Sequence, residues 1–214
     1  LIGLVAAHIV ALHEVGSNNP DGVEIKKKKD SRGIPLDGIP FHPYYTVKDI
    51  VGVVGFLIVF SFIVFFAPEG GGYFLEFNNF IPADPLKTPP HIAPVWYFTP
   101  FYSILRAVTY PLFGIDAKFW GVVAMGAAVV IIAFLPWLDR SPVKSIRYKG
   151  GLFKIILTVF VISFFILGYL GVLPPTPGRT LVSQICSVIY FAFFLLMPVY
   201  SKMDKTKPVP ERVS

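Results

Sequence analysis

Four stretches of this sequence are apolar over a length that crosses a lipid bilayer, and this feature leaves the chain very few possible folds. They lie at residues 50–67, 119–136, 152–171 and 181–200. About 20 helical residues, at ~1.5 Å each, cross the ~30 Å hydrocarbon core. Because lipid offers no partner for backbone N–H and C=O groups, each stretch must be helical despite its β-branched and aromatic content. We therefore predict an all-α, polytopic transmembrane helical protein with four complete spans.

The placement of charge predicts the orientation of these spans. The formal net charge is +6, which by itself could suggest a nucleic-acid partner. However, fourteen Lys and Arg residues lie on one side, in segments 14–49, 137–151 and the C-terminal tail, and four lie on the other, in segments 68–118 and 172–180. Loops rich in Lys and Arg face the cytoplasm or matrix, so we place the first set, side one, there and the second set on side two. We expect the run 26–29 to lie near anionic headgroups and expect no nucleic-acid partner.

The sequence opens inside an apolar run, residues 1–12, with neither a Met nor a signal-peptide pattern. We interpret this run as the tail of an earlier helix, and a short buried or interfacial helix is the alternative. The single Cys186 lies inside the fourth apolar stretch, and no CxxC motif is present. One thiol makes no intrachain disulfide, so we interpret Cys186 as a packing residue.

Two of the four histidines, His8 and His13, lie in or next to the apolar opening run. An imidazole in hydrocarbon is costly unless it is bonded or ligated, so His8 is a candidate functional residue. A histidine satisfied by a neighbouring helix is the alternative. Five residues correspond to about 140° around a helix. His8 and His13 therefore cannot chelate one metal together and must have different roles.

His13 and Asp49 are expected at similar depth, near the side-one interface. A His–Asp pair at a membrane boundary can bind a polar group and exchange protons with water. The alternative is simpler: Asp49 is favourable near a helix N-terminus and His13 extends toward water.

The segment 68–118 is long, rich in proline and rich in aromatic residues. A flexible linker would be rich in Ser, Gly and charge instead. We predict that this segment folds back onto the membrane surface on side two and forms a pocket. For its Trp and Tyr residues the alternative is an interfacial aromatic belt.

These motifs resemble those of a known family. His8 with "LHEVGSNNP" (12–20), "IPFHPYYTVKD" (39–49), "PPHIAPVWYFTPFYSILR" (89–106) and "LPWLDRSPVKSIRY" (135–148) resemble the C-terminal half of cytochrome b from a bc1-type quinol:cytochrome c oxidoreductase. The resemblance divides the chain into residues 1–49, with the end of a haem-binding helix and a quinone-reduction loop, and residues 50–214, the C-terminal membrane domain. Within the latter, residues 68–118 correspond to the quinol-oxidation loop.

The resemblance implies a haem site on the opening helix. His8 matches the position of an axial ligand to the iron of the high-potential b haem. Asn18 and Asn19 match positions near the haem propionates. The other three axial histidines of the family lie on earlier helices, so this chain is not expected to bind haem or to be active alone.

The resemblance also implies a quinone-reduction site on side one. His13, Ser17 and Asp49 match its histidine, serine and aspartate. Two further residues are expected beside them, Phe41 and Lys48.

On side two the resemblance implies a quinol-oxidation site around residues 94–97. The family's Pro-Glu-Trp-Tyr motif is Pro94, Val95, Trp96 and Tyr97 here. Valine cannot accept a proton or a hydrogen bond, so the proton route is expected to use Tyr97, water or another group. A valine at this position resembles a variant of some bacterial members. Other residues expected nearby are Phe98, Tyr102 and Pro90.

The resemblance implies a subunit that transfers electrons from quinol through b haems to quinone, coupled to proton translocation, in a bacterial inner membrane rather than a mitochondrial one. The partners it implies are the N-terminal half of cytochrome b, a Rieske iron–sulfur protein, cytochrome c1, a second cytochrome b in a homodimeric complex, quinone and membrane lipid. One alternative is a split, haem-free subunit of a cytochrome bf-type complex. Another is a non-redox membrane transporter, although no internal repeat favours it.

Overall fold

The computed structural model describes residues 1–72, 77–89 and 92–213, and within these ranges the regular elements are all helices. The chain divides into two compact units, residues 1–37 with 96–214 and residues 38–95. The α-helices are α1 (Ile2–Val15), α2 (Tyr44–Phe66), α3 (Thr99–Ala107), α4 (Ala117–Val130), α5 (Leu135–Leu138), α6 (Gly151–Val172), α7 (Pro177–Leu195) and α8 (Met197–Met203). The 3₁₀ turns are η1 (Ile25–Lys27), η2 (Gly70–Gly72), η3 (Phe77–Phe80), η4 (Trp96–Phe98) and η5 (Ile131–Phe134).

Four helical stretches in the described ranges are long and apolar enough to cross a membrane, which confirms the predicted all-α, multi-pass architecture. Helix α6 agrees with the predicted third span to within one residue at each end. Helix α2 begins six residues before the predicted first span, at Tyr44. No residue of α2 is buried, although the structure describes this whole helix. A helix that is apolar all round and uncovered by its own chain requires lipid or another protein around it.

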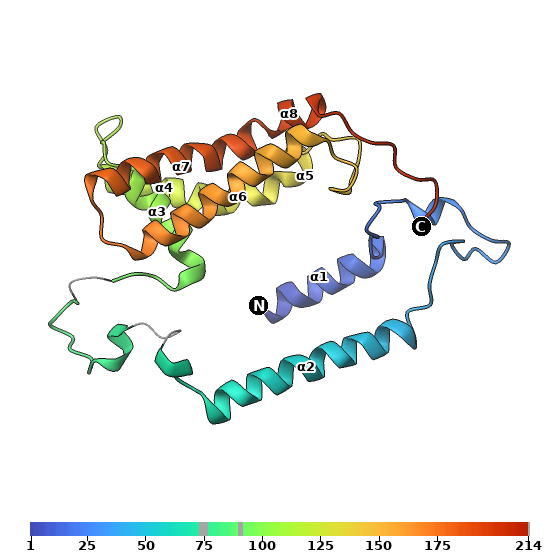
Figure 1. Ribbon diagram of the computed structural model, residues 1–214, viewed down its shortest axis with the longest axis horizontal. Coiled ribbons are helices and arrows are strands. Elements are labelled where there is room, and N and C mark those ends of the chain that lie inside the picture. Colours follow the sequence, from blue (N-terminus) through green and yellow to red (C-terminus); the bar gives the residue numbers. More distant parts are fainter. Residues whose placement is uncertain (73–76, 90–91, 214) are drawn as a thin grey trace. The chain divides into compact units, whose positions relative to one another are not determined.

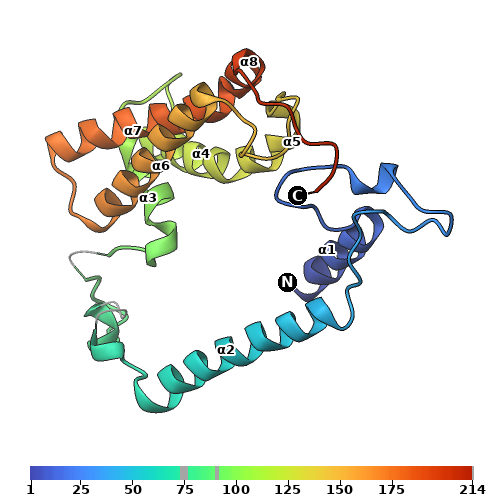
Figure 2. The same cartoon turned by 45° about the vertical axis from the view of Figure 1, so that its right-hand side comes forward.

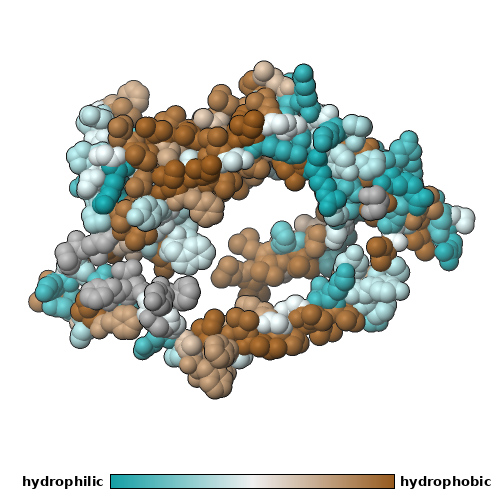
Figure 3. All heavy atoms as spheres, viewed as in Figure 1, coloured by the Kyte–Doolittle hydropathy of each residue, from teal (hydrophilic) through white to brown (hydrophobic). Residues whose placement is uncertain are grey.

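The larger unit is built on a bundle of α3, α4, α6 and α7 (Figure 1). Helices α6 and α7 lie side by side in both views (Figure 2). Aromatic rings fill the space between them: the rings of Phe160 and Phe193 stack at 4.2 Å, and Tyr190 donates a hydrogen bond to the carbonyl of Ala128 at 2.8 Å. Cys186 is buried in this core, which confirms its interpretation as a packing residue. The outer face of the bundle is hydrophobic along its length (Figure 3).

Proline residues explain where two spans depart from a continuous α-helix. The second span is interrupted by η5 just before Pro136, and the fourth is interrupted at Leu196 just before Pro198. Proline has no N–H to donate, and its ring clashes with the carbonyl four residues earlier. The preceding turn therefore tightens to 3₁₀ geometry or breaks. As a result the predicted stretch 181–200 is divided between α7 and α8.

The segment 68–118 contains a helix, α3, that the sequence analysis did not predict. Its Thr99, Ser103 and Ala107 are buried at a spacing of four residues, with Ile104 1% exposed. Ser103 donates a hydrogen bond to the carbonyl of Leu167 at 2.6 Å. Helix α3 therefore belongs to the protein core rather than to a surface loop. Residues 73–76 and 90–91 of this segment, including Pro90 and His91, lie outside the described residues.

Two glycines allow α3 to approach its neighbours closely. A Cβ added to Gly171 of α6 would lie 2.7 Å from the carbonyl carbon of Thr99. A Cβ added to Gly121 of α4 would lie 2.5 Å from the carbonyl oxygen of Leu105. Both obstacles are backbone atoms, which cannot rotate away as the end of a side chain can. The position of α3 therefore depends on the absence of a side chain at these two positions.

We predict that Gly171→Ala displaces α3 and lowers stability by about 1–3 kcal/mol, the usual cost of overpacking. Thermal unfolding of the purified membrane protein in detergent measures this effect. The matched control is Gly126→Ala in α4, where an added Cβ meets nothing within 4 Å. An equal loss in both variants would contradict the role assigned to Gly171.

Candidate functional site

Helix α1 carries both candidate histidines of the opening run, and none of its residues, all of them described, is buried. The His13 Nδ1 atom lies 2.8 Å from the carbonyl oxygen of Ile9 in the preceding turn. This contact holds one ring nitrogen and leaves Nε2 exposed. Within the described residues His8 makes no hydrogen bond or ion pair, so its imidazole is available to a group from outside this chain.

The loop after α1 is closed by contacts of its own. Helix α1 ends at Gly16, whose φ of 77° suits glycine. The Lys26 ammonium donates to the carbonyl of Val15 at the end of α1. Ser17 is exposed just beyond this turn. The closed loop therefore keeps Ser17 next to the last turn of α1, one turn after His13.

The two candidate asparagines have different surroundings. The Asn19 side chain bonds both polar groups of Val23: its Nδ2 donates to the carbonyl at 2.7 Å, and its Oδ1 accepts from the amide at 3.0 Å. Asn18 is exposed, and its Oδ1 accepts from the amide of Asn19 at 2.9 Å. The side-chain amide of Asn19 thus stabilises the loop itself, whereas the Nδ2 of Asn18 remains available for an outside acceptor.

Asp21 is the strongest link between this loop and the rest of its unit. The residue is 3% exposed, and its Oδ1 accepts hydrogen bonds from Arg147 Nη1 at 3.1 Å and from the Tyr148 hydroxyl at 2.9 Å. Hydrogen bonds to a charged group contribute about 1.5–3 kcal/mol each, because the charge strengthens them. The hydrogen bond to Asp21 is also the main cause that raises the pKa of Tyr148.

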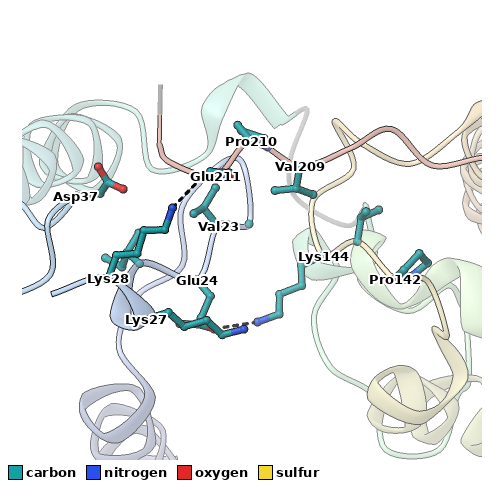
Figure 4. Close-up of a pocket in the computed structure, with 13 residues that line it drawn as sticks. Val23, Glu24, Lys27, Lys28, Asp37, Pro142, Lys144, Val209, Pro210 and Glu211 are labelled. Carbon is teal, nitrogen blue, oxygen red and sulfur yellow. Dashed lines mark hydrogen bonds and ion pairs between the residues drawn. The ribbon is translucent and has the colours of Figure 1, made fainter.

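The C-terminal tail lies against the same loop. Lys28 pairs with Glu211 at 3.0 Å, and Lys144 pairs with Glu24 at 3.3 Å, as Figure 4 shows. Loop, linker and tail line an open pocket of about 580 Å³. The four side chains of these two pairs are all at least 46% exposed. Exposed pairs of this kind contribute about 0–1 kcal/mol each. Lys28–Glu211 therefore holds the tail, and Lys144–Glu24 the linker, less firmly than Asp21 is held.

Three predicted residues of the quinone-reduction site lie in the smaller unit. Phe41 stacks on Tyr45 at 6.0 Å, and Lys48 lies over the ring of Tyr45 at 5.4 Å. Asp49 is exposed in the second turn of α2, next to Lys48. Lys48 and Asp49 thus lie near the beginning of α2, and Phe41 lies three residues before it.

The aromatic segment that follows Val95 is short and exposed. Trp96 and Tyr97, 81% and 61% exposed, meet edge to face at 5.7 Å in the single turn η4. Phe98, at the end of η4, packs on Phe101 of α3 at 5.9 Å. Pro94 is half-buried and Val95 is exposed. Because η4 runs directly into α3, the position of α3 sets where Trp96 and Tyr97 are displayed.

Arg106 fixes α3 to the end of α6. Its Nη1 and Nη2 donate to the carbonyls of Leu173 and Leu170 at 3.0 and 2.6 Å, which are otherwise unpaired at a helix C-terminus. Its guanidinium lies over the ring of Tyr102 at 4.7 Å. Among the described residues, Arg106 Nε is buried without a hydrogen-bond partner. Arg106 thus holds Tyr102 in place while it caps α6.

Comparison with known proteins decides the family. The sequence model of the family described as "Cytochrome b(C-terminal)/b6/petD" matches residues 82–191, which is half of the chain. The chain belongs to the cytochrome b C-terminal family. This confirms the resemblance on which the sequence analysis relied.

Relatives in this family match the chain from end to end. Cytochrome b of Allochromatium vinosum is 62% identical over all of this chain and 52% of that protein. Cytochrome b of Rhodospirillum rubrum is 45% identical over all of this chain and 49% of that protein. A solved structure of a "Hyperthermophilic respiratory Complex III" is similar at a TM-score of 0.76 and 40% identity, covering 95% of this chain and 48% of that one. The chain thus spans about half the length of these relatives and corresponds to the C-terminal part of cytochrome b.

The residues of α1 fit one side of a b-haem site. A haem ligated by two histidines needs an unpaired imidazole on an apolar surface. His8 supplies such an imidazole, and the uncovered apolar face of α1 supplies the surface. Within the described residues no cluster of three or more His, Cys, Asp or Glu side chains could hold a metal ion. Helix α1 thus offers one imidazole, that of His8, on an apolar face, which is what one side of such a haem site requires.

The sequence analysis did not single out Asp21 or Arg106. Arg106 lies four residues after Tyr102, a spacing that places both on one face of a helix, so it could have been found once α3 was recognised. Asp21 gave no such signal, because its partners lie 126 and 127 residues away.

We predict that Arg212→Gln frees the C-terminal tail. Arg212 donates to Asp37 at 2.7 Å, and this hydrogen bond holds the pKa of Asp37 below its usual range. The attachment is therefore complete above the unfolded pKa of Asp37 and is lost as the pH falls through the lower folded pKa. Trypsin cleavage after Lys205, which is exposed and precedes Thr206, should be faster in the variant at neutral pH when it is followed by mass spectrometry.

The matched control is Arg140→Gln, an equal charge change on the same side of the membrane, with no side-chain hydrogen bond or ion pair in the described structure. The wild-type tail should also become sensitive in high salt. Equal cleavage of Arg212→Gln and the wild type would show that the pair does not hold the tail.

Proposed function

We propose that this chain is the C-terminal part of the cytochrome b subunit of a bc1-type respiratory complex. Quinol is oxidised on side two, electrons cross the membrane through b haems, and quinone is reduced on side one, with protons released and taken up on opposite sides. The observation that carries the proposal is His8, an unpaired imidazole on an apolar helix of a chain in the cytochrome b family.

His8 would hold the iron of the high-potential b haem from one side. The bound haem supplies one-electron transfer. Helix α1 contributes its apolar face, which keeps water away from the ring, and Asn18 offers its Nδ2 to a propionate. Asn19 acts through the loop, because its amide is used by Val23.

On side one, His13, Ser17 and Asp49 would bind quinone and supply protons. Because the carbonyl of Ile9 accepts from Nδ1–H, the exposed Nε2 of neutral His13 can accept from a hydroquinone hydroxyl, and the imidazolium form can donate from Nε2 to a quinone carbonyl. Ser17 and Asp49 are both exposed and can exchange protons with water. Phe41 and Lys48 would line the site from the beginning of α2.

On side two, residues 94–97 would border the quinol-oxidation site, with Phe98 and Tyr102 behind them. Val95 accepts no proton, so Tyr97 and ordered water would carry the proton away. Arg106 and the two glycines at α3 support this proposal, because they fix the helix on which Tyr102 lies and from which η4 extends.

The proposed partners are the N-terminal half of cytochrome b, an iron–sulfur protein of the Rieske type, cytochrome c1 and a second cytochrome b. The uncovered apolar faces of α1 and α2 support a partner within the membrane. The bacterial relatives support a bacterial inner membrane with side one in the cytoplasm.

The first test is the reduced-minus-oxidised spectrum of the complex purified through this chain. We expect a b-haem band, and we expect His8→Leu to remove the contribution of one of two b haems. His42→Gln, which removes an imidazole from the smaller unit, should leave the band unchanged. A complete complex without a b-haem signal would overturn the proposal.

A second prediction concerns Val95. If the proton leaves through water and Tyr97, Val95→Glu adds an acceptor that titrates near the usual pKa of glutamate, and the pH profile of quinol oxidation shifts toward lower pH. Val95→Gln is the uncharged control of similar size. Steady-state quinol oxidation between pH 5 and 9, measured at about nine pH values half a unit apart, would resolve the shift. An unchanged profile in Val95→Glu would sink this account of the site.

A further inference from the structure

The loop that carries Ser17 is attached to the rest of its unit through the linker between α5 and α6. Three contacts join them: Asp21 with Arg147 and Tyr148, Ser145 Oγ with the carbonyl of Pro20 at 2.5 Å, and Lys144 with Glu24 at 3.3 Å. The linker therefore contacts three residues of the loop, Pro20, Asp21 and Glu24, which lie within a stretch of five residues.

These contacts differ in burial. The Asp21 side chain is 4% exposed beside an Arg147 side chain that is 61% exposed, whereas the side chains of Lys144 and Glu24 are 65% and 46% exposed. Water and salt compete with the exposed pair but reach the Asp21 carboxylate poorly. Asp21 is thus the attachment that resists competition from solvent.

Ser17 itself has no anchor. It is exposed and makes no hydrogen bond within the described residues, so its position depends on the backbone of the loop. Helix α1 holds that backbone just before Ser17, and Asp21 holds it four residues after Ser17. A change at Asp21 therefore moves Ser17 without touching it.

We propose that Asp21 is a positioning residue for the quinone-reduction site: with Arg147 and Tyr148 it sets the place of Ser17 relative to His13. The inference rests on the proposed function. It makes the linker between α5 and α6 a structural part of that site, although this linker supplies no residue that touches quinone.

The Tyr148 hydroxyl keeps its proton in this arrangement and so remains a hydrogen-bond donor. The hydrogen bond to Asp21, together with burial, raises the pKa of Tyr148 above its ordinary value near 10. Tyr148 therefore keeps its hydroxyl proton, and can donate it to Asp21, across the physiological range.

The test uses the intact complex with Asp21→Asn and, separately, Tyr148→Phe. Reduced b haems are mixed rapidly with a soluble short-chain quinone, and the half-saturating quinone concentration for their re-oxidation is measured. We expect it to rise by about tenfold in Asp21→Asn, with less change in the maximal rate. Quinol oxidation on side two and b-haem content should stay at wild-type levels.

Asp30→Asn is the matched control, since Asp30 pairs with Arg32 within the same loop and contacts nothing in the linker. Ser17→Ala, introduced into the wild type and into Asp21→Asn, tests the route of the effect. If Asp21 acts through Ser17, Ser17→Ala raises the half-saturating quinone concentration by a smaller factor in Asp21→Asn than in the wild type.

An unchanged half-saturating concentration in both Asp21→Asn and Tyr148→Phe overturns the inference, as does full additivity with Ser17→Ala. If Asp21→Asn fails to assemble, Tyr148→Phe decides, because it removes a single hydroxyl. Absence of quinone-dependent re-oxidation in the wild type would instead overturn the proposed function.

Discussion

The fold depends on one constraint, that backbone N–H and C=O groups within hydrocarbon must find partners inside their own segment. This requirement makes the four long apolar stretches helical and moves irregular backbone to their ends. The candidate functional residues lie in the same places, at the ends of the helices. The candidate residues of side one lie where α1 ends and α2 begins, and those of side two lie where η4 leads into α3. The helices are long enough to cross the membrane, and the segments where they begin and end carry the candidate functional residues.

On side two, helix α3 connects the membrane-spanning helices to the candidate residues of η4. Gly121 and Gly171 let its backbone lie against α4 and α6, and Arg106 ties its last turn to the carbonyls that end α6. The displayed rings of Trp96 and Tyr97 have little packing of their own. Their position is therefore a property of the bundle, and the family's aromatic motif is specified in part by glycines more than 20 residues away in sequence.

Sequence reasoning predicted what depends on local pattern and missed what depends on distant partners. The span at α6 was predicted to within one residue, since apolar length defines it. The ends of α4 and α7 were misjudged at Pro136 and Pro198, where the sequence did hold the signal. Helix α3 was missed because its buried stripe is polar in part, with Thr99 and Ser103. The pairing of Asp21 with Arg147 has no local signature, so only the folded chain reveals it.

The two candidate sites are supported by different physical forces. On side two, tight backbone packing in a medium without water fixes α3, and salt has little effect on such contacts. On side one, ion pairs hold the loop, the linker and the tail at a surface in contact with water, where screening weakens the exposed pairs first. The carboxylate of Asp21 is buried and that of Asp37 is only 10% exposed, so these two attachments are shielded better than the exposed pairs. In the proposed function this loop borders a site that takes up quinone and protons from water, and the buried attachment at Asp21 holds the backbone around Ser17 even where the exposed pairs open.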